Sequence, residues 1–549
     1  MAKKELRAFS DLREMLRAVA RRGGTKTALR EKRDGIYQDI SFGLLCEETE
    51  ALCTALRALL PPDARVVIWA KKSVACVRAH LALLTGAGVP VPADAALDAA
   101  RVAAITTRMG ATAVLCDAAR AAQLPTLEGV RVLTLEELSA CIDSGRERVT
   151  AGESAWAQPL DAHATAAVFL TMGSAKGVML SHANICHTLF GIARMTAIDR
   201  DDVFLSVLPL SHAYEYICGM LSPLSLGATV VLGEGLPHLL RDLRRTAPTC
   251  MVSVPYLAEA IYERLCRDIA DHGAEKRLRR TTAVAQAVRL PALGRIVRER
   301  MLARERALLG GKLSRMLILG GNIDPSVQEG LSEFGILALQ GYAVTECAAL
   351  AALCADGCQK SGTAGRALPD CMLDIYNVQP DGYGEIRCKG PNVMSGYLGD
   401  EARTAEALRD GWFYTGDFGY IDADGLLHVI GRKQNGIRVA GGRVVSPEEL
   451  EILLARGTLV REVAVVAAPD AKGKDYQPVA QVLPDRSAFD AMMGAEATDE
   501  LLEHAIGEWV DEVNAALPAH KRIGAVALVE KPFARDAAGR ILRTALTTE

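Results

Sequence analysis

Residues 411–451 read GWFYTGDFGYIDADGLLHVIGRKQNGIRVAGGRVVSPEELE, and this stretch constrains the fold more than any other. Strand-forming aromatic and aliphatic residues recur through 414–421, and the DADG turn at 422–425 leads into a second apolar run at 426–430. An Asp- and Gly-rich turn between two such runs is typical of an antiparallel hairpin. We therefore expect a rigid hairpin around residue 420.

Two polar residues flank the predicted hairpin. Asp417 lies in a Thr-Gly-Asp turn, and Arg432 follows the second strand. A carboxylate and a guanidinium held by one rigid hairpin suit the hydroxyls and the phosphate of a nucleotide. Gly431 and Gly436 bracket the polar tetrapeptide 432–435, where glycine gives the backbone freedom to swivel.

Length and composition indicate an ordinary soluble enzyme with several structural units. A chain of 549 residues is too long for one simple core, so we expect two to four units. Hydrophobic residues make up 50%, charged residues 24%, and the net charge is −4, which predicts no nucleic-acid partner. The longest uncharged run, 216–233, is interrupted by Pro223 and Gly227, so it predicts a buried helix and a strand rather than a membrane span.

The N-terminal segment and the cysteines indicate the cellular compartment. Residues 1–24 predict a charged amphipathic helix without the apolar core of a secretory signal. The 14 cysteines are scattered and form no CxxC pair, which predicts reduced thiols and no zinc site. We therefore expect a cytoplasmic protein.

The first 160 residues alternate between helix and strand patterns, which predicts a parallel sheet with helices on both faces. The predicted helices are 11–22, 44–60 and 74–84, and the predicted strands are 27–30, 37–42, 66–70, 113–116 and 130–133. Residues 143–162 are polar and rich in turn formers, so we expect a linker there.

Further apolar strands end in loops whose residues are suited to bind a ligand. The strand 164–170 leads into TMGSAKGVMLSH at 171–182, where backbone amides and one lysine can meet an anion and a hydroxyl can reach Mg²⁺. The strand 316–319 runs into Gly-Gly-Asn, and 336–339 ends in QGYAVTE. Because ligands collect at the carboxyl ends of parallel strands, these loops predict a binding site. Taken alone, His212 in LPLSHAYE is better interpreted as a core histidine at a strand end.

Taken together, these motifs resemble the adenylate-forming enzymes, which include acyl-CoA synthetases, luciferases and the adenylation domains of peptide synthetases. YTGD, GRK and SPEELE are most similar to the long-chain fatty acyl-CoA synthetase branch. The resemblance implies that Asp417 and Arg432 contact the ribose and that Gln434 is the hinge between a large and a small domain. The tail KGVMLSH also matches, but the loop from Thr171 to Gly177 has seven residues where the family has ten.

The resemblance assigns roles to the remaining site residues. Tyr342 would stack on adenine, Thr345 would contact the phosphate, and Glu346 would hold Mg²⁺, a role in which Thr171 also takes part. His212 would line the carboxylate site, and Lys176 and Arg540 would act in catalysis, although the family has lysine at the position of Arg540. The other predicted nucleotide- or CoA-binding residues are Thr171, Gly173, Ser174, Gly177, Gly320, Gly321, Gln340, Gly341, Gly441 and Arg443.

The resemblance also implies an α/β fold with three parts. Residues 1–430 would form a large N-terminal AMP-binding domain of doubly wound mixed sheets with helices and a small β-barrel-like subdomain. Residues 431–435 would be the hinge, and 436–549 a small mobile α+β domain. Residues 276–312 are strongly basic, which is consistent either with a solvated helix pair or with contact to an anionic lipid surface.

The implied reaction is the ATP- and Mg²⁺-dependent activation of a long-chain fatty acid to acyl-AMP, followed by transfer to CoA. Two alternatives stay open. The short loop, Ala343 in place of a family glycine and Arg540 are consistent with a degenerate member that adenylates weakly or only binds its ligands. The thiol acceptor can also be an acyl carrier protein rather than CoA.

Overall fold

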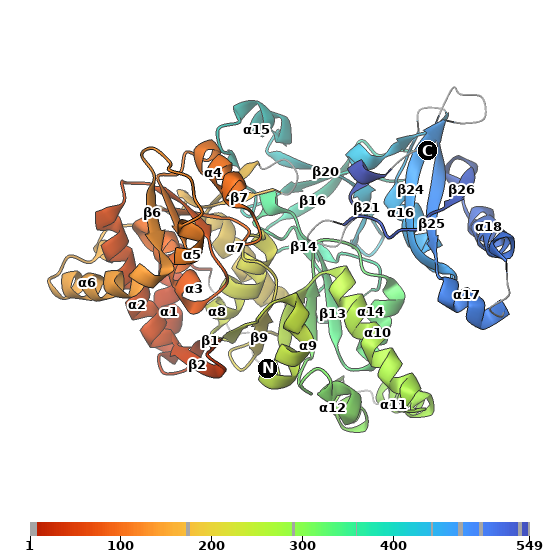
Figure 1. The fold of residues 1–549 in the computed structure, drawn as a ribbon, viewed down its shortest axis with the longest axis horizontal. Helices are drawn as coiled ribbons and strands as arrows, with labels where there is room; N and C mark the ends of the chain where they lie inside the picture. The colour runs from red at the N-terminus through yellow and green to blue at the C-terminus, as the bar shows by residue number, and fades with distance from the viewer. Residues whose placement is uncertain are drawn as a thin grey trace. The chain divides into compact units, whose positions relative to one another are not determined.

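The computed structural model describes residues 8–171, 176–287, 291–357, 360–380, 382–440, 443–469, 476–493, 498–535 and 541–546 (Figure 1). The chain forms two compact units. The first consists of Met1–Leu373 and Cys388–Phe413, and the second of Asp374–Arg387 and Tyr414–Glu549. The chain therefore enters the second unit, returns to the first and enters the second again.

A nine-stranded sheet forms the centre of the first unit, in the order β15-β14-β13-β12-β11-β9-β10-β1-β2. The strands from β13 to β1 along this order run parallel, while β2, β14 and β15 pair antiparallel at the two edges. The two strands β10 and β11 are buried at every residue, as expected for parallel strands covered on both faces. The bounds are β1 (Thr27–Arg33), β2 (Ile36–Ser41), β9 (Val203–Ser206), β10 (Thr229–Leu232), β11 (Cys250–Ser253), β12 (Arg315–Ile318), β13 (Leu337–Tyr342), β14 (Ala352–Leu353) and β15 (Arg366–Ala367).

Two smaller sheets complete the first unit. The four-stranded sheet β4-β3-β5-β6 is wholly parallel, and the three-stranded sheet β18-β8-β7 is antiparallel. Trp69, Val114 and Val168 belong to one core cluster that joins these sheets. The bounds are β3 (Arg65–Trp69), β4 (Val89–Pro92), β5 (Ala113–Cys116), β6 (Arg131–Thr134), β7 (Thr165–Leu170), β8 (Gly177–Ser181) and β18 (Gly396–Tyr397). The short strand β19 (Leu408–Arg409) lies in another sheet.

Helices cover the sheets of the first unit, and several of their N-termini are capped by a side chain. Asp11, Ser41 and Ser73 each accept a bond from a backbone N–H of the following helix. The bounds are α1 (Leu12–Gly23), α2 (Phe42–Leu59), α3 (Val74–Ala82), α4 (Ala99–Arg108), α5 (Ala118–Ala121), α6 (Leu138–Thr150), α7 (His182–Met195), α8 (Ser222–Leu226), α9 (Leu239–Thr246), α10 (Pro255–Asp271), α11 (Glu275–Ala287), α12 (Pro291–Met301), α13 (Ala303–Ala307), α14 (Pro325–Glu333) and α15 (Glu401–Ala407).

The predicted linker at 143–162 is wrong for its first eight residues, because α6 runs through to Thr150. This polar helix packs against α2 through a narrow stripe of buried residues. Leu138 and Ile142 are buried, and a Cβ on Gly145 would lie 2.0 Å from the Ala51 carbonyl oxygen of α2. The small residue lets the two helices approach closely, which a composition-based reading misses.

The uncharged run 216–233 is confirmed as a buried helical segment followed by a strand. It forms the π-helix η4 (Glu215–Leu221), then α8 and β10. Among the helices of the described ranges, none is both long and apolar enough to cross a membrane. None of the described cysteines is in a disulfide, as predicted.

The second unit contains the predicted hairpin and a smaller α+β part. Strands β20 (Trp412–Ile421) and β21 (Leu427–Arg432) pair antiparallel, with Asp417 opposite Arg432. Beyond them, the sheet β24-β25-β26 packs against helices around one core that includes Val465, Val482 and Ile506. The bounds are β16 (Met372–Tyr376), β17 (Gly384–Lys389), β22 (Ile437–Arg438), β23 (Val444–Val445), β24 (Val460–Pro469), β25 (Tyr476–Pro484), β26 (Ala525–Leu528), α16 (Pro447–Leu454), α17 (Arg486–Met493) and α18 (Asp499–Ala516).

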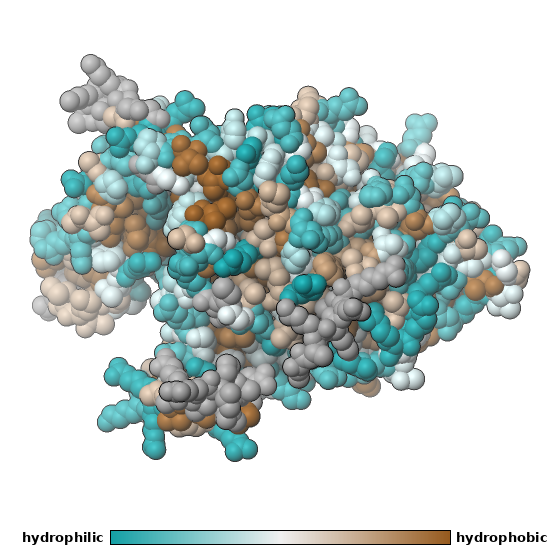
Figure 2. Space-filling view, turned by 180° about the vertical axis from the view of Figure 1, so that it is seen from behind, coloured by the Kyte–Doolittle hydropathy of each residue, from teal (hydrophilic) through white to brown (hydrophobic). Residues whose placement is uncertain are grey.

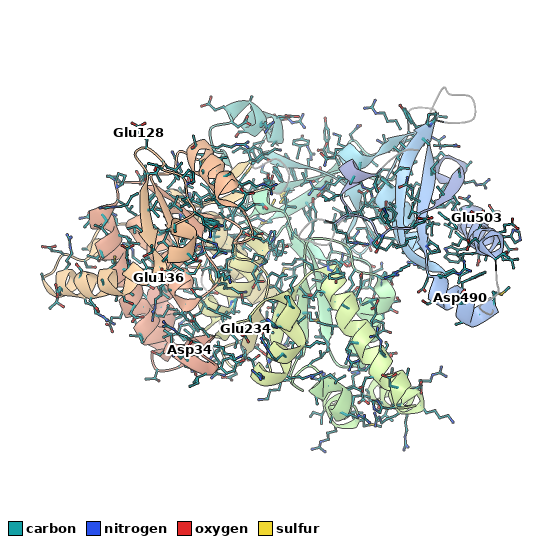
Figure 3. The ribbon with its side chains drawn as sticks, viewed as in Figure 1. Asp34, Glu128, Glu136, Glu234, Asp490 and Glu503 are labelled. Atoms are coloured by element: carbon teal, nitrogen blue, oxygen red, sulfur yellow. The ribbon has the colours of Figure 1, made fainter. Side chains whose placement is uncertain are left out.

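Several acidic side chains lie on the outside of the two units. Figure 3 labels six of them, which project from loops and helix surfaces. Asp34, Glu128, Glu136 and Glu234 in the first unit are exposed, as is Glu503 in the second.

Candidate active site

The carboxyl ends of β12 and β13 in the first unit hold two of the predicted motifs side by side. Gln340 on β13 is 1% exposed, and its amide donates to Asn322 Oδ1 (3.0 Å) in the loop after β12. Gly320 has a φ of +88°, a conformation that favours glycine. A Cβ on Gly341 would lie 2.8 Å from the Leu319 side chain, so this position needs glycine for close packing. These glycines shape the loops that the sequence predicted to bind the nucleotide.

The QGYAVTE motif continues from the end of β13 into a short 3-10 turn. Tyr342 is the last residue of β13 and is 6% exposed, and Thr345 begins the turn η6 (Thr345–Cys347). Ala348 and Ala349 follow with φ of +47° and +74°. The left-handed region costs an alanine about 1–2 kcal/mol, so strain is concentrated directly after this motif.

Glu346 is suited to act as a single carboxylate ligand for Mg²⁺. Its Oε1 accepts a hydrogen bond from the Tyr397 hydroxyl (2.8 Å), and no bond to Oε2 is found within the part of the chain that the structure describes. The same described residues contain no group of three or more His, Cys, Asp or Glu side chains that could hold a metal ion. Mg²⁺ is typically bound by one or two carboxylates together with substrate phosphates, so this donor set suits it.

The predicted phosphate loop connects two antiparallel strands rather than a strand and a helix. Leu170 of β7 pairs with Gly177 of β8, and the Thr171 N–H donates to the Lys176 carbonyl (3.0 Å). The Lys176 ammonium lies 5.0 Å from the centre of the Tyr397 ring. Lys176 and Glu346, from motifs far apart in sequence, therefore converge on one tyrosine.

His212 lies in the loop after β9, and its surroundings are polar and buried. Its ring stacks on Tyr214 at 5.3 Å between ring centres, and its backbone N–H donates to the Pro209 carbonyl (3.1 Å). A Cβ on Gly320 would lie 3.9 Å from the Tyr214 ring, so the loops after β9 and β12 are neighbours. His212 is therefore a half-buried ring beside a loop of the predicted site, and its role stays a prediction.

A buried polar chain supports the loop that carries His212. The Lys72 ammonium donates to the Ser206 hydroxyl (2.9 Å) and to the Leu208 carbonyl (3.1 Å), and the Ser206 hydroxyl donates to Glu215 Oε1. Glu215 is 0% exposed, and burial raises its pKa to about 7 although the Lys72 charge opposes the shift. Burial likewise lowers the pKa of Lys72 to about 8. Lys72 also lines a cavity of about 50 Å³ with residues 209–211.

In the second unit, the structure pairs the two predicted ribose contacts. Asp417 is 5% exposed and forms an ion pair with Arg432 (2.9 Å) across the hairpin. Gln434 is exposed in the turn η7 (Lys433–Asn435). Arg443 is exposed and contacts the His520 ring (2.9 Å). The four remaining predicted site residues, Gly173, Ser174, Gly441 and Arg540, lie outside the described residues.

Two residues near the site were missed by the sequence analysis. Tyr397 follows a glycine in MSGYLG, and Lys72 lies in AKKS, and neither stretch was singled out by a motif or by spacing. A tyrosine after a glycine, preceding an Asp-capped helix, was the available signal for Tyr397. Nothing local distinguishes Lys72 from its neighbour Lys71.

A mixed α/β unit whose parallel strands end in glycine-rich loops with hydroxyl and carboxylate groups is the architecture of a nucleotide-binding α/β protein. Residues 16–398 match the family described as AMP-binding enzyme, and the chain belongs to that family. The family resemblance drawn from the motifs is thereby confirmed.

Two of the curated relatives are named as acid–CoA ligases. The chain is 32% identical over 316 residues to long-chain-fatty-acid–CoA ligase 6 of Mus musculus, covering 54% of this chain and 44% of the relative. It is 33% identical over 324 residues to indoleacetate–CoA ligase of Aromatoleum aromaticum, covering 57% of this chain and 56% of the relative. The chain thus matches about half the length of these curated relatives.

Solved structures confirm the predicted α/β fold class. ATP-bound MatB from Rhodopseudomonas palustris has a TM-score of 0.74 at 22% identity and covers 97% of both chains. The Mycobacterium tuberculosis fatty acyl CoA synthetase has a TM-score of 0.66 at 21% identity and covers 97% of both chains. At this level of identity the likeness shows the fold.

Proposed function

We propose that the chain is an AMP-forming acid–thiol ligase that activates a fatty acid as acyl-AMP and transfers the acyl group to CoA. The observation that carries this proposal is the convergence of Lys176 and Glu346 on Tyr397, at the end of the predicted phosphate loop. A cationic group and a carboxylate oxygen with no other partner are what a bound Mg²⁺–triphosphate requires. The choice of a fatty acid as the substrate and of CoA as the thiol rests on the names of the curated relatives.

In the proposed first step, an oxygen of the substrate carboxylate attacks the α-phosphorus of ATP and pyrophosphate leaves. Both reactants are anions, so positioning and charge compensation set the barrier. Lys176 holds the polyphosphate, Thr345 contacts it, and Glu346 together with Thr171 holds the Mg²⁺. When bound, Mg²⁺ offsets the negative charge that develops on the phosphate oxygens.

Other residues of this chain bind and orient the two reactants. Tyr342 stacks on the adenine, while Asp417 and Arg432 hold the ribose. His212 lines the carboxylate site on a loop that the Lys72 chain fixes from behind. Arg540 supplies a further positive charge in this step.

In the proposed second step, a thiol attacks the acyl carbonyl and AMP leaves. We propose the boundaries 1–430, 431–435 and 436–549, with rotation about Gln434 between the two steps. Gly441 and Arg443 would then face the CoA.

The test is incubation of the purified protein with ATP, Mg²⁺, CoA and a panel of fatty and aryl acids, followed by mass spectrometry. Formation of acyl-CoA would support the ligase and identify the acid it prefers. Acyl-AMP without acyl-CoA would point to a carrier-protein acceptor. Neither product, from protein that binds ATP, would overturn the proposal in favour of the degenerate member suggested by the short loop and Arg540.

We also propose that part of the basic segment 276–312 binds an anionic lipid surface. It includes the helices α11 and α12, which project from the first unit (Figure 1) and bear hydrophilic side chains around apolar ones at the lower left of Figure 2. Val284 and Ile296 are each 40% exposed. Among the side chains of this segment that the structure describes, the exposed basic ones are Lys276, Arg277, Arg279, Arg280, Arg300, Arg304 and Lys312. Exposed apolar side chains and exposed cations on the same segment suit such a surface.

Not every basic residue of this segment is available to a lipid. Arg306 is 3% exposed and donates to the carbonyls of Phe334 and Leu313, and Arg277 pairs with the buried Glu305. Co-sedimentation with vesicles containing anionic lipid would test the proposal, with Arg279→Glu/Arg280→Glu as the variant and neutral vesicles as the control. Equal binding of the variant and the original protein to anionic vesicles would contradict it.

A further inference from the structure

The backbone around Tyr397 is fastened to two of the predicted phosphate-site motifs. Its strand β18 pairs antiparallel with β8, directly after the phosphate loop. The Leu398 N–H donates to the Gly177 carbonyl (2.7 Å), and the Met394 N–H donates to the Glu346 carbonyl (2.8 Å). The segment that carries Tyr397 therefore cannot move without moving both motifs.

The sequence next to Tyr397 fixes its direction. Gly396 has a φ of +149°, and a Cβ there would lie 2.8 Å from the Thr404 side chain. Thr404, in α15, accepts the Tyr397 N–H on its hydroxyl (2.9 Å). Gly396 leaves room for the Thr404 side chain, and Thr404 holds the N–H of Tyr397. Together these two contacts set the direction of the tyrosine ring.

The Tyr397 side chain contacts both functional groups at once. Its hydroxyl donates to Glu346 Oε1 (2.8 Å), and the face of its ring lies 5.0 Å from the Lys176 ammonium. The residue is 6% exposed.

Lys176 and Glu346 carry opposite charges, yet within the described ranges they form no ion pair with each other. A direct pair would satisfy both charges and withdraw them from a bound polyphosphate. Tyr397 gives each of the two groups a contact of its own, because its hydroxyl donates to Oε1 of Glu346 and its ring lies beside the Lys176 ammonium. Oε2 of Glu346 is left for a cation.

We infer that Tyr397 is a positioning residue that keeps Glu346 and Lys176 apart and directed at the same bound Mg²⁺–ATP; the inference rests on the proposed function of this site. Tyr397 touches neither reacting atom in this assignment. It acts through the carboxylate at its hydroxyl and the ammonium on its face, so the two contacts can be removed separately.

The test measures binding rather than turnover, in the absence of any acid substrate. ATP binding to the full chain is followed by titration calorimetry over a series of Mg²⁺ concentrations. Tyr397→Phe keeps the ring and removes the hydroxyl, so we expect the Mg²⁺ concentration for half-maximal ATP binding to rise about tenfold. Tyr397→Leu also removes the ring, so we expect a further loss of about threefold in ATP affinity at saturating Mg²⁺.

Two controls separate positioning from a general loss of structure. Tyr256→Phe makes the same change at a tyrosine that is 58% exposed in α10, and it should leave both quantities unchanged. Tyr397→Phe should have no added effect on the Mg²⁺ dependence in a Glu346→Gln background, since it acts through that carboxylate. Circular dichroism checks folding, and if Tyr397→Leu does not fold, Tyr397→Phe alone decides the inference.

An unchanged Mg²⁺ dependence in Tyr397→Phe, or an effect that persists in full with Glu346→Gln, would overturn the inference while leaving the ligase proposal intact. A shifted Mg²⁺ dependence in a protein that makes no acyl-AMP would support the inference and overturn the ligase proposal. A wild-type chain that binds no Mg²⁺–ATP would overturn both.

Discussion

Substituting Lys72 by methionine should destabilise the first unit strongly. The Lys72 ammonium has three acceptors, the Ser206 hydroxyl and the carbonyls of Ser206 and Leu208, and its charge opposes the burial cost of Glu215. Methionine keeps the apolar stem of the side chain but has no ammonium. The three acceptors then lose their donor, and the Glu215 carboxyl, which is 0% exposed, loses the neighbouring positive charge. Removing one partner of a buried charged pair costs about 3–5 kcal/mol, so we expect a loss of that order.

The double variant Lys72→Met/Glu215→Gln gives the sharper measurement. Removing both charges leaves no unpaired ion, so its free energy of unfolding should fall by about 2 kcal/mol less than the sum of the two single losses. Chemical denaturation followed by tryptophan fluorescence suits this test, because Trp69 is 2% exposed on β3, close to Lys72.

Lys71→Met is the matched control, since Lys71 is the exposed neighbour with the same side chain. It should change the free energy of unfolding by less than about 0.5 kcal/mol. A loss below about 1 kcal/mol for Lys72→Met, or losses that simply add in the double variant, would refute the view that the chain from Lys72 through Ser206 to Glu215 is a coupled unit.

Three further outcomes are expected. Because burial raises the pKa of Glu215 from 4.5 to about 7, the folded state holds a proton that the unfolded state releases, and stability should fall as pH rises from about 4.5 to 7; melting temperatures of Glu215→Gln should lack this part of the fall, and an unchanged profile would count against it. Arg306→Met should cost about 2–4 kcal/mol in denaturation, since it strips the donors from buried carbonyls, whereas the exposed Arg304→Met should be nearly neutral. Gly145→Ala should push α6 away from α2 and cost about 1–3 kcal/mol, and a variant as stable as the original would show that this contact yields easily.

Sequence patterns predicted the elements whose signal is local. Apolar runs ending in glycine marked β12 and β13, and the alternation around residue 420 marked the hairpin with Asp417 opposite Arg432. Helix α6 was missed because its buried stripe is only Leu138, Ile142 and Gly145 in an otherwise polar segment.

The missed site residues depend on long-range pairing that no local pattern encodes. Tyr397 reaches Lys176 because β18 pairs with β8, a strand more than 200 residues earlier in the chain. Lys72 reaches Ser206 across 134 positions. The role of Gln434 as a hinge and the role of Arg540 stay predictions.

The double passage of the chain between the two units has a consequence for biosynthesis. In the sheet order, β17 neighbours β20, yet residues 388–413 of the first unit are made between them. At about 5–20 residues per second, a ribosome leaves the segment 374–387 without that neighbour for some seconds. During this interval an unpaired strand edge is exposed on the nascent chain. Expression of 414–549 alone would leave β20 without its neighbour β17, so the second unit cannot be obtained by a single cut.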